Sequence, residues 1–226
     1  MSERVELFDK WAETYDASVR DCDGFPFEGY EDVLDEVVRL SDVSADMTVL
    51  DLGIGTGGLA RRFIERRCTV WGLDFSVKML ARVHARFPQI ELIKADLLGD
   101  WPIDHDQRFD RIASGYVLHE FDLTSKVRLV ERLVKRHLSS GGLMVVGDIS
   151  FATAGARDEA QRKWQGTWDE AKREWQGSLW DEDEHYWAAD EASDALSEAG
   201  LLVVCYHQVS FCGGVYVIGC PDGTSE

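Results

Sequence analysis

The chain of 226 residues is 45% hydrophobic, which is enough apolar material for one sizeable domain and argues against a disordered protein. Its 42 acidic residues outnumber its 24 basic ones, and the net charge of −18 would repel the phosphate backbone of a nucleic acid. No apolar run approaches the roughly 20 residues that cross a membrane, and the first residues, MSERVELFDK, lack an apolar signal region. We therefore expect a cytoplasmic protein with neither a membrane nor a nucleic-acid partner.

Residues 1–45 are predicted to form helices with an irregular link at GFPFEGY, as an N-terminal helical cap. In residues 46–150, short β-rich runs alternate with helical stretches, the pattern of a parallel sheet with helices on both faces. The expected strands are TVLDLG, TVWGLD, IELIKAD, RFDRIASGY and LMVVGDIS. The expected helices run from the glycine loop to about Arg67, over Ser76–Phe87 and over Lys126–Leu138, where Gly141 and Gly142 are the stop signal.

After residue 150 the pattern changes. Residues 151–187 are polar, helical in propensity and contain five of the eight tryptophans. Residues 188–226 then give a helix at Asp190–Ala199 and two β-rich runs, LLVVCYHQVS and GGVYVIGC. Because only a few residues join these runs, they should form an antiparallel hairpin. We expect one α/β domain with four parts: the cap, a core at residues 46–150, an insertion at 151–187, and a final helix with the hairpin.

The stretch VLDLGIGTGG at residues 49–58 fits two ligand-binding patterns. Its glycines fit the dinucleotide fingerprint G-x-G-x-x-G, and Asp51 followed by Gly53, Gly55 and Gly57 fits a nucleoside-binding loop that begins with an acid. A carboxylate at the end of this strand would face a pyrophosphate at a cost of several kcal/mol at an effective dielectric of ~20, so Asp51 favours a ligand with a cationic portion. The alternative is that Asp51 only caps the following turn.

Two further acids follow predicted strands. Asp74 ends the second strand 21 residues after Gly53, where an acid can accept both hydroxyls of a ribose. The alternative role for Asp74 is the N-cap of the helix that begins near Ser76. Asp96, in KADLL after the third strand, is placed to accept from an adenine amine, although aspartate after a strand is also common in turns.

The ordered set of Asp51 with its glycines, LDFSVKML, KADLL and the closing hairpin resembles the seven-stranded S-adenosylmethionine (AdoMet)-dependent methyltransferase family over nearly the whole chain. The resemblance implies a Rossmann-like three-layer sandwich with a mostly parallel seven-stranded sheet, AdoMet as cofactor and S-adenosylhomocysteine (AdoHcy) as product. FDKWAETYD looks like a segment of small-molecule methyltransferases whose Tyr-Asp pair, here Tyr15 and Asp16, lies over the cofactor. FEGYEDVLDEVV and DEDEHYW resemble largely uncharacterised bacterial methyltransferases.

The motifs and the resemblance together predict which residues bind the cofactor. The five cysteines form no C-x-x-C pair, and no set of acids and amides suggests a catalytic magnesium, so no metal site is predicted. The predicted cofactor-binding residues are Tyr15, Asp51, Gly53, Gly55, Gly57, Asp74, Phe75, Ser76, Met79, Asp96, Leu97 and Ser114.

In the family, the segment after the fourth strand faces the transferred methyl, and here it reads SGYVLHEF. His119 is the candidate general base and Tyr116 a second catalytic candidate. Alternatively, His119 hydrogen-bonds backbone and both residues only shape the pocket. The segment lacks the prolines of amino-methylating DNA enzymes, which again disfavours a nucleic-acid substrate. The predicted substrate pocket comprises Tyr30, Tyr116, His119, Trp164, Trp168, His185 and Tyr186.

The insertion is predicted to form a lid over this pocket, because its aromatic residues share one helix face of roughly 80° at about 100° per residue. The alternative is a helix anchored to the sheet by ordinary core packing. The residues of this face are Ala160, Trp164, Trp168, Ala171 and Trp175.

The sequence thus predicts transfer of a methyl group to a small-molecule acceptor by in-line displacement, mainly through positioning, in a monomer or homodimer. Three alternatives remain open: a protein methyltransferase, an enzyme that transfers another group such as aminopropyl, and a regulatory protein that binds AdoMet or AdoHcy without turnover.

Overall fold

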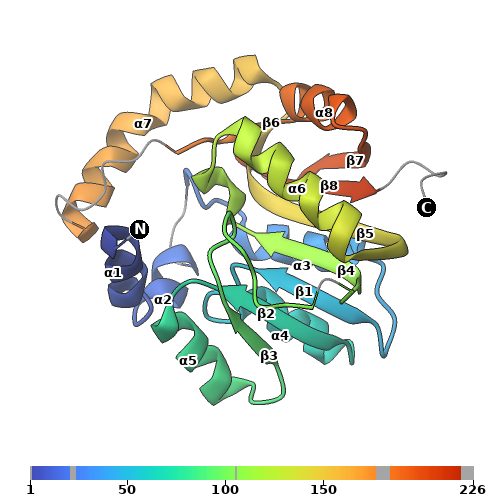
Figure 1. Ribbon diagram of the computed structural model, residues 1–226. Helices are drawn as coiled ribbons and strands as arrows, with labels where there is room; N and C mark the ends of the chain where they lie inside the picture. The colour runs from blue at the N-terminus through green and yellow to red at the C-terminus, as the bar shows by residue number, and fades with distance from the viewer. Residues whose placement is uncertain (1, 21–23, 105, 177–183, 220–226) are drawn as a thin grey trace.

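The computed structural model describes residues 2–20, 24–104, 106–176 and 184–219 (Figure 1). Within these ranges, the side chains of residues 2–4, 7, 17, 18, 20, 165 and 167–176 are not described.

A mostly parallel sheet runs through the centre of the molecule in the order β3-β2-β1-β4-β5-β8-β7. The β1, β2, β3, β4 and β5 strands pair in parallel, whereas β8 pairs antiparallel with both β5 and β7. A two-residue strand, β6, adds to β5 off this path. The predicted fold class, with its closing hairpin, is confirmed. The strands are β1 (Thr48–Leu52), β2 (Thr69–Asp74), β3 (Glu91–Lys94), β4 (Phe109–Gly115), β5 (Leu138–Phe151), β6 (Trp187–Ala188), β7 (Leu202–Gln208) and β8 (Gly213–Gly219).

Helices cover both faces of the sheet because side chains alternate along each strand. In β1, Val49 joins one core cluster with α3, α4 and α5, whereas Leu50 and Leu52 join a second cluster with α6 and α8. The three layers of the predicted sandwich follow from this alternation. These helices are α3 (Tyr30–Leu40), α4 (Gly58–Glu65), α5 (Val77–Arg86), α6 (Leu123–His137) and α8 (Ala189–Glu198).

The remaining helices lie at the periphery (Figure 1). They include α1 (Ser2–Trp11) and α2 (Tyr15–Arg20), and an irregular link leads from there to α3 on the sheet. Most of the insertion forms α7 (Ala154–Gln176), and a short 3₁₀ turn, η1 (Leu118–Glu120), follows β4. Among the described side chains of α7, Ala160 and Trp164 pack on the core cluster that contains α3.

One predicted boundary was wrong. The helix α6 ends at His137, and the chain is already extended at Leu138, so Gly141 and Gly142 lie inside β5 instead of stopping the helix. The reason is tertiary: Leu138 pairs with Phe109 of β4 and is buried in the core. Burial and strand pairing at Leu138 outweigh the local glycine signal.

Candidate active site

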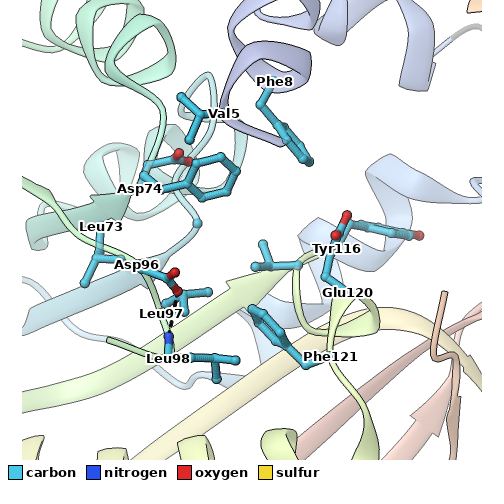
Figure 2. Close-up of a pocket in the computed structure, with 13 residues that line it drawn as sticks. Val5, Phe8, Leu73, Asp74, Asp96, Leu97, Leu98, Tyr116, Glu120 and Phe121 are labelled. Carbon is cyan, nitrogen blue, oxygen red and sulfur yellow. Dashed lines mark hydrogen bonds between the residues drawn. The ribbon is translucent and has the colours of Figure 1, made fainter. Parts of the chain in front are cut away.

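A cavity of ≈ 240 Å³ lies at the carboxyl ends of β1, β2, β3 and β4 (Figure 2). This is the edge at which open α/β sheets bind ligands. Its walls come from α1, the glycine loop, the ends of β2 and β3, and the segment that includes η1 after β4. The lining residues are Val5, Phe8, Gly53, Leu73, Asp74, Phe75, Asp96, Leu97, Leu98, Tyr116, Val117, Glu120 and Phe121.

The glycine loop turns sharply between β1 and α4. Gly53, Gly55 and Gly57 all have positive φ, of 63°, 53° and 86°. At Gly53, an added Cβ atom would also lie only 2.6 Å from Cγ2 of Val117 across the cavity wall. Glycine is therefore required at Gly53 both for its backbone conformation and for the close approach of the segment after β4.

Asp51 is the last residue but one of β1 and is almost completely buried. Burial, with a further contribution from the charge of Asp74, raises the pKa of Asp51 well above its usual range, while the backbone N–H of Ala60 in the first turn of α4 lowers it. Asp51 thus has the capping contact considered as an alternative. Its Oδ2 atom nevertheless has no hydrogen-bond partner within the part of the chain that the structure describes. A buried carboxylate oxygen in that state fits a cationic ligand group, as the sequence predicts.

Asp74 is the last residue of β2, and each of its carboxylate oxygens accepts a hydrogen bond from the backbone. Its Oδ2 accepts the backbone N–H of Gly55 at 2.9 Å, and its Oδ1 accepts that of Ser76 at 2.8 Å. Burial raises the pKa of Asp74, and the backbone N–H groups oppose this shift. The N-cap of α5 is Ser76, whose hydroxyl accepts from Met79 N, so the alternative role of Asp74 as N-cap is wrong. Each carboxylate oxygen keeps acceptor capacity for the cavity.

Asp96 has the turn contact that the sequence offered as an alternative, and it also lies at the cavity. Its Oδ1 accepts the backbone N–H of Leu98 at 2.9 Å and so forms the turn after β3. The residue also lines the cavity together with Leu97 (Figure 2).

The N-terminal helices α1 and α2 are tied to the cofactor-loop region by polar contacts. Ser76 Oγ donates to Asp9 Oδ1 at 2.6 Å, and Thr56 Oγ1 donates to Asp16 Oδ1 at 2.5 Å. Phe8 also packs edge-on against Phe75, with ring centroids 5.3 Å apart. Asp16 therefore fastens the helix to the glycine loop and does not line the cavity. Sequence reasoning missed Phe8 and Asp9, which only a tertiary contact identifies.

Tyr15 lies next to Tyr30 in an aromatic cluster behind the cavity. A hydrogen bond joins the two hydroxyls, and burial raises the pKa of Tyr15 to about 12. The Tyr30 ring packs on that of Tyr116, with centroids 4.7 Å apart. Tyr116 lines the cavity at a positive φ of 57°, an uncommon conformation for a residue other than glycine that often marks functional sites. The hydroxyls of Tyr116 and Ser114 have no hydrogen-bond partner among the described residues.

His119 is buried beside Asp148, a residue that the sequence analysis did not single out. Its Nδ1 lies 2.6 Å from Asp148 Oδ1, and its backbone N–H donates to Asp148 Oδ2 at 2.9 Å. Asp148 also accepts from Trp187 Nε1 at 3.1 Å and from the backbone N–H of Ile149 at 2.8 Å. The sequence signal that could have identified Asp148 is its position as an acid inside the otherwise apolar run LMVVGDIS.

The ring of His119 does not line the cavity, but the next residue, Glu120, does. The two side chains are neighbours, with His119 Nε2 3.9 Å from Glu120 Oε1. The sequence did not single out Glu120, because nothing in SGYVLHEF indicates which of two adjacent side chains reaches the cavity. His119, the predicted base, therefore lies outside the cavity lining, whereas the carboxylate of Glu120 is part of it.

The other predicted pocket residues are dispersed. Trp164 packs near Phe211, at 6.2 Å between ring centroids, and Tyr186 packs edge-on against Phe25 at 5.4 Å. His185 is exposed and lines a second cavity of ≈ 290 Å³ with Tyr186. The side chains of Trp168, Ala171 and Trp175 lie outside the described residues, so the lid stays a prediction.

Of the predicted cofactor-binding residues, those that line the cavity directly are Gly53, Asp74, Phe75, Asp96 and Leu97. The other predicted cofactor-binding residues do not line it: Tyr15, Asp51, Gly55, Gly57, Ser76, Ser114 and Met79, the last of which is buried in α5. No described helix has both the length and the apolar character needed to cross a membrane. Over the described ranges, no group of three or more histidine, cysteine or acidic side chains is arranged to hold a metal ion.

Comparison with known proteins agrees with this arrangement. A family model described as a methyltransferase domain matches residues 49–142, from β1 into β5. An uncharacterized methyltransferase of Geobacillus thermodenitrificans is 32% identical over 152 residues, which cover 66% of this chain and 68% of the relative. A similar relative from Anoxybacillus flavithermus is 31% identical over 152 residues, with the same coverage.

Solved structures share the fold over nearly the full length. A chain from the complex between the Haloferax volcanii Trm112 methyltransferase activator and a methyltransferase superposes with a TM-score of 0.72 at 18% identity, covering 98% of this chain and 99% of that one. The structure of DhpI with SAH superposes with a TM-score of 0.69 at 18% identity, covering 98% and 97%. The sequence relatives, the order of strands in the sheet and the position of the cavity all indicate the same family. The chain belongs to the class I S-adenosylmethionine-dependent methyltransferases.

Proposed function

We propose that the protein transfers the methyl group of AdoMet to a small-molecule acceptor by in-line displacement in the cavity at the carboxyl ends of β1, β2, β3 and β4. The observation that carries this proposal is the series of acids at three successive strand ends, with Asp74 and Asp96 lining the cavity and the unpartnered Oδ2 of Asp51 buried beneath the glycine loop.

The residues present fit this cofactor. Asp74 keeps acceptor capacity for the ribose hydroxyls, because its backbone contacts occupy only part of each oxygen. Asp96 offers an acceptor for the adenine amine, with Phe75 and Leu97 as apolar wall. Asp51 Oδ2 is a buried acceptor with no partner among the described residues, and a cationic group of the cofactor beside it would favour the charged carboxylate against the burial that raises its pKa. When bound, AdoMet supplies a methyl group on a carbon already activated for displacement.

The contribution of the protein to the reaction is mainly positional. A nucleophile must be held about 3–3.5 Å from the methyl carbon and in line with the breaking bond. Tyr116, Glu120 and Phe121 form the wall after β4, where an acceptor would bind, and α1 covers the site through Phe8. The hydrogen bond from Ser76 to Asp9 holds α1 in place, and that from Thr56 to Asp16 holds the neighbouring α2, which would help to exclude water.

The rings of Phe8, Tyr116 and Phe121 in the cavity wall would suit a small acceptor. The acidic net charge disfavours a nucleic acid. We further propose a cytoplasmic monomer or homodimer. Because one structural neighbour was solved in a complex with an activator protein, an activator is a partner to include when the activity of this chain is tested.

The test is a two-stage measurement on the purified full chain. Calorimetry first measures binding of AdoMet and AdoHcy, and AdoHcy release is then followed over a panel of amines, thiols, phenols and carboxylates. Binding followed by release with a member of the panel is the expected result. Tight AdoHcy binding with no release across the panel would favour the regulatory alternative, and release only with a protein acceptor would favour a protein methyltransferase.

A further inference from the structure

The turn after β3 forms one end of the cavity wall. Asp96, Leu97 and Leu98 line the cavity and lie together in Figure 2. Two local hydrogen bonds shape the turn: the backbone N–H of Gly99 donates to the Asp96 carbonyl at 3.1 Å, and that of Leu98 donates to Asp96 Oδ1 at 2.9 Å. These bonds fix the turn internally, but by themselves they do not fix where it lies relative to the sheet.

Arg132 of α6 holds this turn from outside. Its guanidinium donates from Nη1 to the carbonyl of Gly99 at 2.8 Å and from Nη2 to the carbonyl of Leu97, across 33 and 35 residues of sequence. A planar guanidinium presents its N–H donors in a fixed fork, so one side chain can bind two carbonyls in a defined geometry. A lysine ammonium is a point charge on a flexible stem and imposes no such geometry.

Trp101, which follows the turn, provides a second support. Its Nε1 donates to the Asp96 carbonyl at 2.9 Å. The Arg132 guanidinium lies over its indole ring, with Cζ 4.8 Å from the ring centroid, and the same ring stacks on that of His137, with centroids 5.7 Å apart. Arg132 and His137 both belong to α6, whose apolar side is buried in the core. The turn is therefore held on α6 by two routes, directly by Arg132 and through the indole of Trp101.

The position of this turn decides what the Asp96 carboxylate can recognise. In the proposed function Asp96 accepts from the exocyclic amine of adenine, and its bond to Leu98 leaves acceptor capacity on both oxygens. A hydrogen bond weakens steeply when its donor and acceptor move apart or out of line, so a small shift of the turn would lose it. Hypoxanthine has a carbonyl oxygen in place of the amine and would turn an acceptor toward the carboxylate. A site that binds the amine therefore rejects hypoxanthine.

We propose that Arg132 and Trp101 are positioning residues that hold Asp96 where it accepts from the adenine amine, and that they thereby set the nucleobase specificity of the cofactor site. This inference rests on the proposed function and extends it to residues outside the cavity. Neither side chain lines the cavity, so both act through the turn.

The experiment compares AdoHcy with S-inosylhomocysteine, which has hypoxanthine in place of adenine. Calorimetry measures both dissociation constants on the purified full chain, in the wild type, in Arg132→Met, in Trp101→Phe and in the control Arg136→Met. Arg132→Met keeps an unbranched stem but removes the forked donors, and Trp101→Phe keeps an aromatic ring but removes the Nε1 donor. Arg136 is a matched control because it is an exposed arginine one turn further along α6.

We expect the wild type and Arg136→Met to bind AdoHcy at least tenfold more tightly than S-inosylhomocysteine. In Arg132→Met this ratio should fall at least fivefold, because AdoHcy affinity drops while S-inosylhomocysteine affinity stays within twofold. Trp101→Phe should lower the ratio at least twofold. Arg132→Lys, which keeps the charge and most of the stem, is measured as a variant that disturbs folding less, and it should also lower the ratio at least twofold. Both ligands are measured on one sample, so a partly unfolded fraction does not change the ratio.

Equal weakening of both ligands in Arg132→Met would make Arg132 a purely structural residue and would overturn the inference. An unchanged ratio in Arg132→Met, or in Arg132→Lys should the first variant not fold, would overturn it as well, and an unchanged ratio in Trp101→Phe would remove Trp101 from it. A wild type that binds the two ligands equally would show that Asp96 does not recognise the amine, and the proposed methyl transfer would still stand. A wild type that binds neither ligand would instead refute the proposed function.

Discussion

Replacing Asp148 with alanine removes the acceptor of four buried N–H groups at the rear of the site. These donors are the backbone and Nδ1 of His119, Nε1 of Trp187 and the backbone of Ile149. At about 1 kcal/mol for each buried donor left without an acceptor, the lower end of the usual range, the loss is about 4 kcal/mol. Removing one partner of a buried pair costs ~3–5 kcal/mol, which agrees.

Urea unfolding and thermal melting measure this effect. For a domain of this size, about 4 kcal/mol should lower Tm by roughly 8–16 °C. The control is Asp158→Ala, whose side chain is 58% exposed and pairs with Arg157 at the surface. Such a surface pair is worth about 0–1 kcal/mol, so the control should melt close to the wild type.

The asparagine variant refines the test. An amide has one acceptor oxygen, so Asp148→Asn can serve the donors on one side only, and His119 can adapt by exchanging its ring tautomer. We expect Asp148→Asn to cost less than the alanine variant, about 1–3 kcal/mol, from the unserved N–H of Ile149. A loss below about 1 kcal/mol in Asp148→Ala would refute the view that this carboxylate organises the rear of the site.

Three further predictions concern the cofactor site and the pH dependence of stability. Asp74→Ala should weaken AdoHcy binding by ~1.5–3 kcal/mol in calorimetry, the range for hydrogen bonds to a charged group, and unchanged affinity would remove Asp74 from the site. Gly53→Ala should reduce AdoHcy affinity at least tenfold, because its Cβ would lie 2.6 Å from Val117 at a positive φ; affinity within twofold of the wild type would contradict that geometry. Burial lowers the pKa of Lys126 to about 8, so between about pH 8 and the ordinary value of 10.5 the unfolded chain holds a proton that the folded chain has released. Unfolding free energy should therefore rise with pH over that window by up to about 3 kcal/mol relative to Lys126→Met, and parallel pH profiles for the two proteins would exclude this linkage.

The part of the cavity that we assign to the cofactor was predictable because its signals are local. Asp51, Gly53, Asp74 and Asp96 each lie within a few residues of a strand end, and parallel strands bring their carboxyl ends to one edge of the sheet. Once the order of strands and helices was read from the hydrophobic pattern, the spatial grouping of these residues followed without any knowledge of tertiary contacts.

The acceptor side was less predictable because its parts come from distant segments. Asp148 in β5 meets His119 after β4 and Trp187 in β6, and no spacing in the sequence indicates that these three residues touch. Phe8 reaches Phe75 from the first helix of the chain in the same way. His119 was predicted as the base from its position after β4. Its ring is buried and does not line the cavity.

The difference between the two sides has a functional consequence. In the proposed site, the cofactor would bind at strand ends, whose positions are fixed by the sheet, whereas the acceptor would meet α1 and η1, which are fixed by a few side-chain contacts. Changes in those contacts would alter the acceptor site and leave the cofactor loop intact. In the proposed function the acceptor lies against the segment after β4, so Glu120 and Asp148 are positions at which acceptor specificity should be tested.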